Sequence, residues 1–136
     1  MLVRIVPKLE LDALRLAAVS GRIDAQEHAN DTGARMWWRN ENMARNYCVA
    51  CLGTAQTSEP IGILYFDGLP DATGAAWWLD SRFRGKKLGS RMIDAFAAHL
   101  KTRGVTKIAR IRIDTYMGKY DEQSSALERR LRNHFP

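Results

Sequence analysis

The chain reads, from residue 77, Trp77-Trp78-Leu79-Asp80-Ser81-Arg82-Phe83-Arg84-Gly85-Lys86-Lys87-Leu88-Gly89-Ser90. The apolar run at 75–79 predicts a short buried strand, and the apolar spacing from residue 88 onward predicts a helix. Backbone N–H groups at the start of a helix are unpaired and carry partial positive charge, so they bind anions such as phosphate. Gly85 and Gly89 would let a ligand approach the backbone closely. The segment therefore predicts an anion site between a strand and a helix.

The surrounding sequence is strongly basic, which supports the same interpretation. Residues 82–112 contain ten lysines and arginines and a single acid, Asp94, and the whole chain carries a net charge of +6 at pH 7. A basic surface suits phosphate groups, nucleic acid or acidic partners and does not choose among them. The segment matches neither of two common phosphate-binding patterns, Gly-x-x-x-x-Gly-Lys-Ser/Thr and Gly-x-Gly-x-x-Gly.

Apolar periodicity divides the rest of the chain into helices and strands. Strands are expected at residues 4–6, 47–52, 61–66, 75–79 and 105–113, the second and third as a hairpin. Helices are expected at residues 8–20, 24–28, 31–44, 88–103 and 121–133, with Gly21 and Gly104 as C-terminal stops. The strands at 75–79 and 107–113 are joined by a helix, so we expect them to run parallel. The expected fold class is α/β (an α+β mixed sheet) with helices on both faces.

Length and composition fit one globular domain, residues 1–136. Hydrophobic residues make up 46% and charged residues 26%, which excludes a disordered or low-complexity protein. No apolar run is long enough for a transmembrane helix, and the apolar run at the start is too short for a signal peptide. Two cysteines are too few for a disulfide framework, so we expect a reducing, cytoplasmic location and no membrane partner.

The segment Arg84-Gly85-Lys86-Lys87-Leu88-Gly89 resembles the coenzyme A loop of the GNAT (N-acetyltransferase) superfamily, whose pattern is Gln/Arg-x-x-Gly-x-Gly/Ala. Lys87 stands where the middle glycine is usual. The strand before the loop, the helix after it and the turn at Gly104-Val105 are also similar to that family. The resemblance implies a GNAT-like acyl-CoA N-acyltransferase fold. Relatives usually add one or two strands after the last helix, so we expect a C-terminally trimmed member of the fold.

The resemblance also implies a site. The backbone of the strand would bind the pantetheine arm as an added strand would, and the Leu79 N–H would polarise the thioester carbonyl and stabilise the oxyanion. Amides of the turn would bind the pyrophosphate. The implied coenzyme-binding residues are Trp77, Trp78, Leu79, Arg84, Gly85, Lys86, Lys87, Leu88, Gly89 and Ser90. Acetyl-CoA would be the co-substrate, without a metal, and the acceptor an amine of a small molecule or a protein that attacks the thioester directly.

The residues that move protons are less clear from the sequence. Many relatives carry a glutamate in the fourth or fifth strand, where this chain has none, and Glu128 stands where a tyrosine is common. The remaining candidates are Asp114, Tyr116 and Tyr120, just past the expected fifth strand. Asp80 is also close in sequence, although the side of the strand on which it lies is open. A base that acts through water would leave no trace in the sequence.

Several alternatives remain open at this stage. The missing carboxylate and tyrosine leave room for a catalytically degenerate GNAT-fold binding module that uses its basic face for nucleic acid or an acidic protein. The strand at 105–113 would be an exposed edge, which favours a homodimer that covers it. Cys48 and Cys51 lie on opposite faces of a strand, which favours packing over metal binding. His99 lies on the apolar face of its helix and is expected to be a core residue.

Overall fold

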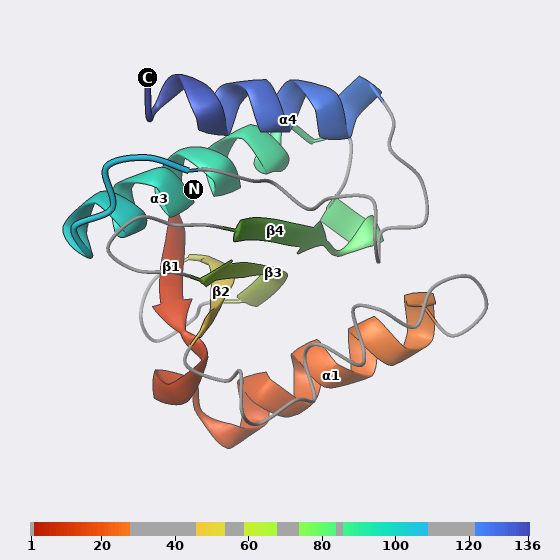
Figure 1. The fold of residues 1–136 in the computed structure, drawn as a ribbon. Helices are drawn as coiled ribbons and strands as arrows, with labels where there is room; N and C mark the ends of the chain where they lie inside the picture. The colour runs from red at the N-terminus through yellow and green to blue at the C-terminus, as the bar shows by residue number, and fades with distance from the viewer. Residues whose placement is uncertain (1, 28–45, 54–58, 68–73, 84–85, 109–121) are drawn as a thin grey trace.

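The computed structural model describes residues 2–27, 46–53, 59–67, 74–83, 86–108 and 122–136. Within these residues the strands form one antiparallel sheet of β1 (Val3–Pro7), β2 (Tyr47–Leu52), β3 (Glu59–Asp67) and β4 (Gly74–Leu79). The strands lie in the order β1-β2-β3-β4, so each pairs with the next one along the chain (Figure 1). The expected strands at 4–6, 47–52, 61–66 and 75–79 are confirmed, as is the hairpin of the second and third.

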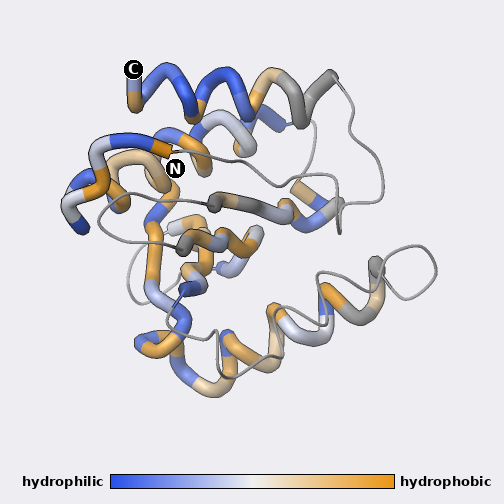
Figure 2. The backbone as a smooth tube through the Cα atoms, viewed as in Figure 1, coloured by the Kyte–Doolittle hydropathy of each residue, from blue (hydrophilic) through white to orange (hydrophobic). Residues whose placement is uncertain are grey.

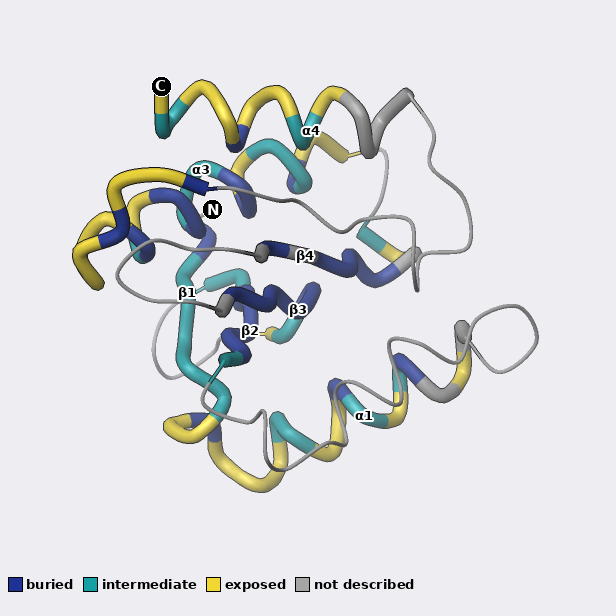
Figure 3. Tube along the Cα trace, viewed as in Figure 1, coloured by how far each residue is buried: buried dark blue, intermediate teal, exposed yellow. Residues whose placement is uncertain are grey.

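Helices cover both faces of the sheet, as the sequence predicts. Helix α1 (Ala13–Glu27) lies against one face, while α3 (Leu88–Thr102) and α4 (Glu122–Asn133) lie on the other (Figure 1). Strands β2, β3 and β4 are buried between these layers (Figure 3). Strand β2 alternates between two apolar clusters, because Cys51 packs on the α1 side and Cys48 on the α3 side. The expected packing role of the two cysteines is confirmed.

The first helix differs from the expected one at both ends. Residues Lys8–Glu10 form a short 3-10 turn, η1, and α1 begins after Asp12, whose Oδ1 accepts the Arg15 N–H at 2.8 Å. The prediction that Gly21 stops the helix is wrong, since α1 runs on to Glu27 and absorbs most of the second helix expected at 24–28. A methyl group at Gly21 would meet nothing within 4 Å, and the apolar face continues past it through the buried Val19 and Ile23. A solvent-facing glycine costs helix stability but does not end a helix whose buried face persists.

The two later helices match their expected limits closely. Gly104 has a φ of 86° and follows the end of α3, and the Val105 N–H donates to Leu100 O at 3.1 Å. This left-handed glycine with a returning hydrogen bond is a common helix ending. Helix α4 is mostly hydrophilic (Figure 2). It rests on α3 through one apolar stripe, where Leu131 is fully buried and Leu127 partly buried.

Other expectations fall on residues outside the described ones. The helix expected at 31–44 lies there, as does most of the strand expected at 105–113, of which only residues 105–108 are described. The parallel pairing of that strand with residues 75–79 is therefore not described either. Within the described ranges, no helix combines the length and the apolar character needed to cross a bilayer.

Candidate functional site

The backbone of β4 has one edge toward β3 and one edge away from it. The Asp80 N–H donates to Ile61 O of β3 at 2.8 Å. Successive residues of a strand point their N–H and C=O groups to opposite edges. The N–H groups of Leu79 and Trp77 are therefore directed away from β3, toward the edge where the family resemblance implies the pantetheine arm.

The side chains of this part of β4 lie inside the protein. Trp77 and Trp78 are each 1% exposed and pack on opposite faces, with Trp77 in the cluster under α3 and Trp78 in the cluster under α1. Leu79 packs beside Trp77 on the α3 side. The family resemblance implies a role for the backbone of these residues, and their side chains belong to the apolar core.

The start of α3 has the features of an anion site. The Lys87 backbone lies in the left-handed region with a φ of 61°, at the position before the helix, and its side chain makes no capping hydrogen bond. The first N–H groups of a helix have no acceptor within the helix and carry partial positive charge. Lys86 and Lys87 are both exposed beside them. The turn thus presents backbone donors and two cations together.

Gly89 occupies the first turn of α3, where its missing side chain faces the protein. A methyl group at this position would stand 3.3 Å from Leu127 Cδ1 and 3.8 Å from Leu79 Cδ2. The packing of α4 over the start of α3 is a reason for glycine here in addition to the ligand approach expected from the sequence.

Asp80 is the one candidate proton-transfer residue within the described ranges. It is 1% exposed and its carboxylate accepts hydrogen bonds from the guanidinium groups of Arg22 and Arg82. A carboxylate held by two guanidiniums favours its charged form and is a weak proton acceptor. The hypothesis that Asp80 is a general base is therefore not supported by its surroundings. Asp114, Tyr116 and Tyr120, as well as Arg84 and Gly85, lie outside the described residues.

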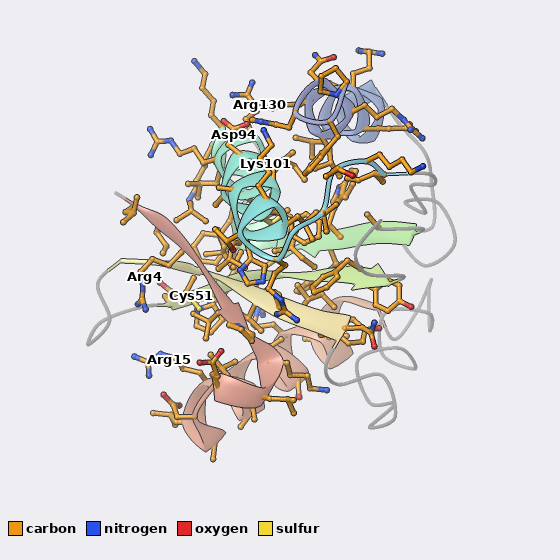
Figure 4. The ribbon with its side chains drawn as sticks, turned by 60° about the vertical axis from the view of Figure 1, so that its left-hand side comes forward. Arg4, Arg15, Cys51, Asp94, Lys101 and Arg130 are labelled. Carbon is orange, nitrogen blue, oxygen red and sulfur yellow. The ribbon has the colours of Figure 1, made fainter. Side chains whose placement is uncertain are left out.

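Asp94, the single acid of residues 82–112, pairs with the C-terminal part of the chain. Asp94 accepts hydrogen bonds from Arg130 of α4 at 2.8 and 2.7 Å, and its Oδ1 lies 2.9 Å from His134 Nε2. Figure 4 shows the Asp94 and Arg130 side chains meeting between the two helices. These hydrogen bonds, that of Arg130 first, lower the pKa of Asp94 to about 2. Asp94 thus ties α3 to α4.

Cys48 and His99 lie together on the α3 side of the sheet, with Cys48 buried and His99, expected as a core residue, only half-buried. His99 lies 3.5 Å from Cys48 Sγ and edge-on to the Phe66 ring, and burial lowers its pKa. Burial raises the pKa of Cys48 to about 12, which keeps its thiol protonated. His99 also borders an open groove of about 700 Å³ between β1 and α3. Among the residues that the structure describes, no cluster of histidine, cysteine, aspartate or glutamate could hold a metal ion.

One residue of the site region was missed by sequence reasoning. Arg22 of α1 reaches Asp80 across 58 positions of sequence. A charged residue on an amphipathic helix normally predicts a solvent-exposed face, so the sequence holds no signal of this contact.

The described residues thus comprise the buried strand β4, an exposed basic turn at Lys86 and Lys87, and the start of the long helix α3. The sequence profile of the acetyltransferase (GNAT) family matches residues 12–117. The chain belongs to that family. A comparison with curated proteins gave no match.

A solved structure shares the fold. An aminoglycoside 6'-N-acetyltransferase in complex with coenzyme A has a TM-score of 0.52 at 16% identity, with 79% of this chain and 59% of that one aligned. A glucosamine-6-phosphate N-acetyltransferase from Arabidopsis thaliana has a TM-score of 0.46 at 14% identity, over 96% and 90% of the two chains. The chain thus spans about three fifths of the aminoglycoside enzyme. The alternative of a degenerate binding module for nucleic acid or an acidic protein finds no support in these comparisons.

Proposed function

We propose that the protein is an acetyl-CoA-dependent N-acyltransferase that transfers an acetyl group to an amine of a small molecule or a protein. The observation that carries the proposal is the direction of the backbone at the end of β4. The Leu79 N–H points away from β3 at the same end of the strand from which the chain turns onto the start of α3. Family membership supports the choice of acetyl-CoA as the ligand.

The described residues fit coenzyme A. The backbone N–H groups of Leu88, Gly89 and Ser90, with the side chains of Lys86 and Lys87, would bind the pyrophosphate. The backbone of Trp77–Leu79 would pair with the amide groups of the pantetheine arm. Coenzyme A, when it carries an acetyl group, supplies an activated thioester. The protein contributes the Leu79 N–H, whose fixed direction favours a developing negative charge on the thioester oxygen.

The surroundings of Asp80 disfavour it as a general base, so proton transfer needs other groups. The amine must lose a proton to become a nucleophile, and the departing thiolate must gain one. Asp114, Tyr116 and Tyr120 stay the candidates for these roles, together with a base that acts through water. Single substitutions by Asn or Phe at these positions, measured as the dependence of kcat on pH, would identify which of them takes part.

The test is thiol release from acetyl-CoA in the presence of a panel of amines. We expect acetyl-CoA to bind and free thiol to appear with at least one amine in the panel. Binding without thiol release from any amine would favour a degenerate binding module, and no binding at millimolar acetyl-CoA would contradict the proposal. Lys86→Ala and Lys87→Ala should weaken acetyl-CoA binding, since both side chains are assigned to the pyrophosphate, and Lys101→Ala, at an exposed position near the other end of α3, is the charge-matched control.

Two further proposals concern the setting of this activity. We propose a homodimer whose interface includes residues 105–136, and a cytoplasmic location. Light scattering after size exclusion tests the first, because a mass of one chain, 15.4 kDa, at tens of micromolar would contradict it.

A further inference from the structure

A buried carboxylate at the end of β4 joins that strand to α1. Asp80 directly follows β4 and is 1% exposed. Its Oδ2 accepts a hydrogen bond from Arg22 Nε at 3.0 Å, and its Oδ1 accepts one from Arg22 Nη2 at 3.2 Å. This two-bond arrangement fixes orientation as well as distance. Arg22 is thus a direct polar tie between α1 and the point where the chain leaves the sheet.

The same carboxylate holds the chain that follows it. Oδ1 accepts the backbone N–H of Arg82 at 3.0 Å, and Oδ2 accepts from Arg82 Nε at 3.2 Å and Nη2 at 3.0 Å. The backbone of Asp80 adds two more bonds, since its N–H donates to Ile61 O at 2.8 Å and its C=O accepts from the Phe83 N–H at 2.9 Å. Asp80 therefore fixes both the end of β4 and the 3-10 turn η3 (Ser81–Phe83) that leads into the basic turn.

A substitution in α1 alone can weaken the hydrogen bonding of Asp80. A buried carboxylate depends on its partners, and removing one of them leaves a charge that the rest of the site compensates less well. The Arg22 side chain is 33% exposed and that of Asp80 is 2% exposed. Replacing Arg22 would therefore weaken the hold on Asp80 without substituting any residue between 74 and 90.

We propose that Arg22 and Asp80 are positioning residues that make the geometry of the coenzyme-binding turn depend on α1. They act through the backbone of residues 79–83, which carries the Leu79 N–H at one end and leads to the start of α3 at the other. The effect on coenzyme binding rests on the function proposed above, whereas the effect on the backbone does not. Arg22→Ala and Asp80→Asn are the informative variants.

Hydrogen exchange on the protein without ligand tests the positioning itself. We expect the Arg82 and Phe83 amides to exchange about tenfold faster or more in Arg22→Ala than in the parent protein, because local opening becomes easier. Arg15→Ala is the matched control, since Arg15 lies on the same helix and pairs with Asp12. Unchanged exchange of both amides in Arg22→Ala would overturn the inference. If that variant does not fold, Arg22→Lys keeps the charge but loses the two-bond fork, and the same amides should still exchange faster than in the parent.

Titration with acetyl-CoA tests the consequence for the ligand. We expect the Kd to rise about tenfold in Arg22→Ala and Asp80→Asn, the size of effect that the loss of one hydrogen bond to the ligand would have. Arg15→Ala should bind as the parent does. Asp94→Asn controls for lost stability, because it removes a carboxylate held by Arg130 and His134 away from the turn.

The two measurements separate the inference from the proposed function. If the parent protein binds acetyl-CoA and Arg22→Ala binds it equally well, the dependence of the binding turn on α1 is refuted while the function stands. If the parent does not bind acetyl-CoA but the two amides exchange faster in Arg22→Ala, the positioning role stands and the function fails.

Discussion

Gly89 of α3 lies directly against Leu127 of α4, so that a methyl group at position 89 would stand 3.3 Å from Leu127 Cδ1. Leu79 of β4 lies on the same side, at 3.8 Å from that methyl position. The end of β4, the start of α3 and the middle of α4 therefore meet at one glycine. Helix α4 thus packs directly against the start of α3, next to the turn that is proposed to bind coenzyme A.

Gly89→Val should destabilise the protein by about 1–3 kcal/mol, because the added methyl groups crowd Leu127. Urea unfolding measures this, with Gly89→Ala as the milder control. Leu127→Ala removes the crowded methyl groups, so Gly89→Val should cost less stability in a Leu127→Ala background than in the parent protein. Gly89→Val should also weaken acetyl-CoA binding, and binding that remains weak in the double variant would show that the ligand itself needs glycine at 89. Full stability of Gly89→Val would contradict the packing described here.

Lys87→Gly should stabilise the protein by about 1 kcal/mol, because a left-handed backbone is costly for any residue with a Cβ. Lys87 is the one residue other than glycine with a positive φ among the residues described. Lys86→Gly is the matched control, since it removes the same charge at a position without this strain. We expect a higher Tm for Lys87→Gly than for Lys86→Gly. Equal or opposite shifts in Tm would argue against the left-handed turn.

Asp94→Asn should lower stability at pH 7 by about 0.5–1 kcal/mol, the range of partly exposed ion pairs. The hydrogen bond from Arg130 holds the pKa of Asp94 at about 2, below its ordinary value of 3.8. Asp94 binds its proton less tightly in the folded protein than in the unfolded chain. The stabilisation by Asp94 is therefore complete above pH 3.8 and is lost as the pH falls toward 2. Urea unfolding of the parent and of Asp94→Asn at several pH values should show the difference between their free energies of unfolding shrinking between pH 3.8 and about 2. A difference that stays constant down to pH 2 would exclude Asp94 as its source.

Gly62→Ala should destabilise the sheet by about 1–3 kcal/mol and weaken acetyl-CoA binding. A methyl group at Gly62 would overlap the carbonyl oxygen of Trp78 and press on Met92 Sδ at 3.1 Å. The backbone of β4 would have to move to relieve this overlap, because the Trp78 oxygen belongs to the main chain. Gly21→Ala is the control, since a methyl group there meets nothing, and it should stabilise α1. Wild-type stability of Gly62→Ala would show that β4 can shift freely.

Most of the described fold follows from local patterns in the sequence. Alternation at 47–52 predicts β2 and assigns each residue to a face, and apolar spacing with Gly104 predicts both ends of α3. These elements are predictable because one buried face sets the apolar spacing of each, and a local residue signals where it ends. Gly21 shows the limit of that reasoning, since glycine ends a helix only where the apolar face also ends.

The site is less predictable because it depends on contacts between distant residues. The pairing of Arg22 with Asp80 and the packing of Gly89 on Leu127 leave no periodic pattern in the sequence. The sequence does predict the strand, the turn and the helix that form the site. It leaves the surroundings of Asp80 open, and these are what argue against Asp80 as a general base.

The most direct test of the account is hydrogen exchange of the parent protein with and without coenzyme A. We predict slower exchange on binding at the Leu79 amide and at the amides of residues 88–90, because these are the backbone donors assigned to the ligand. Residues 93–100 of α3 should be little changed. No slowing anywhere at saturating coenzyme A, or slowing confined to the groove between β1 and α3, would contradict the assignment of the site.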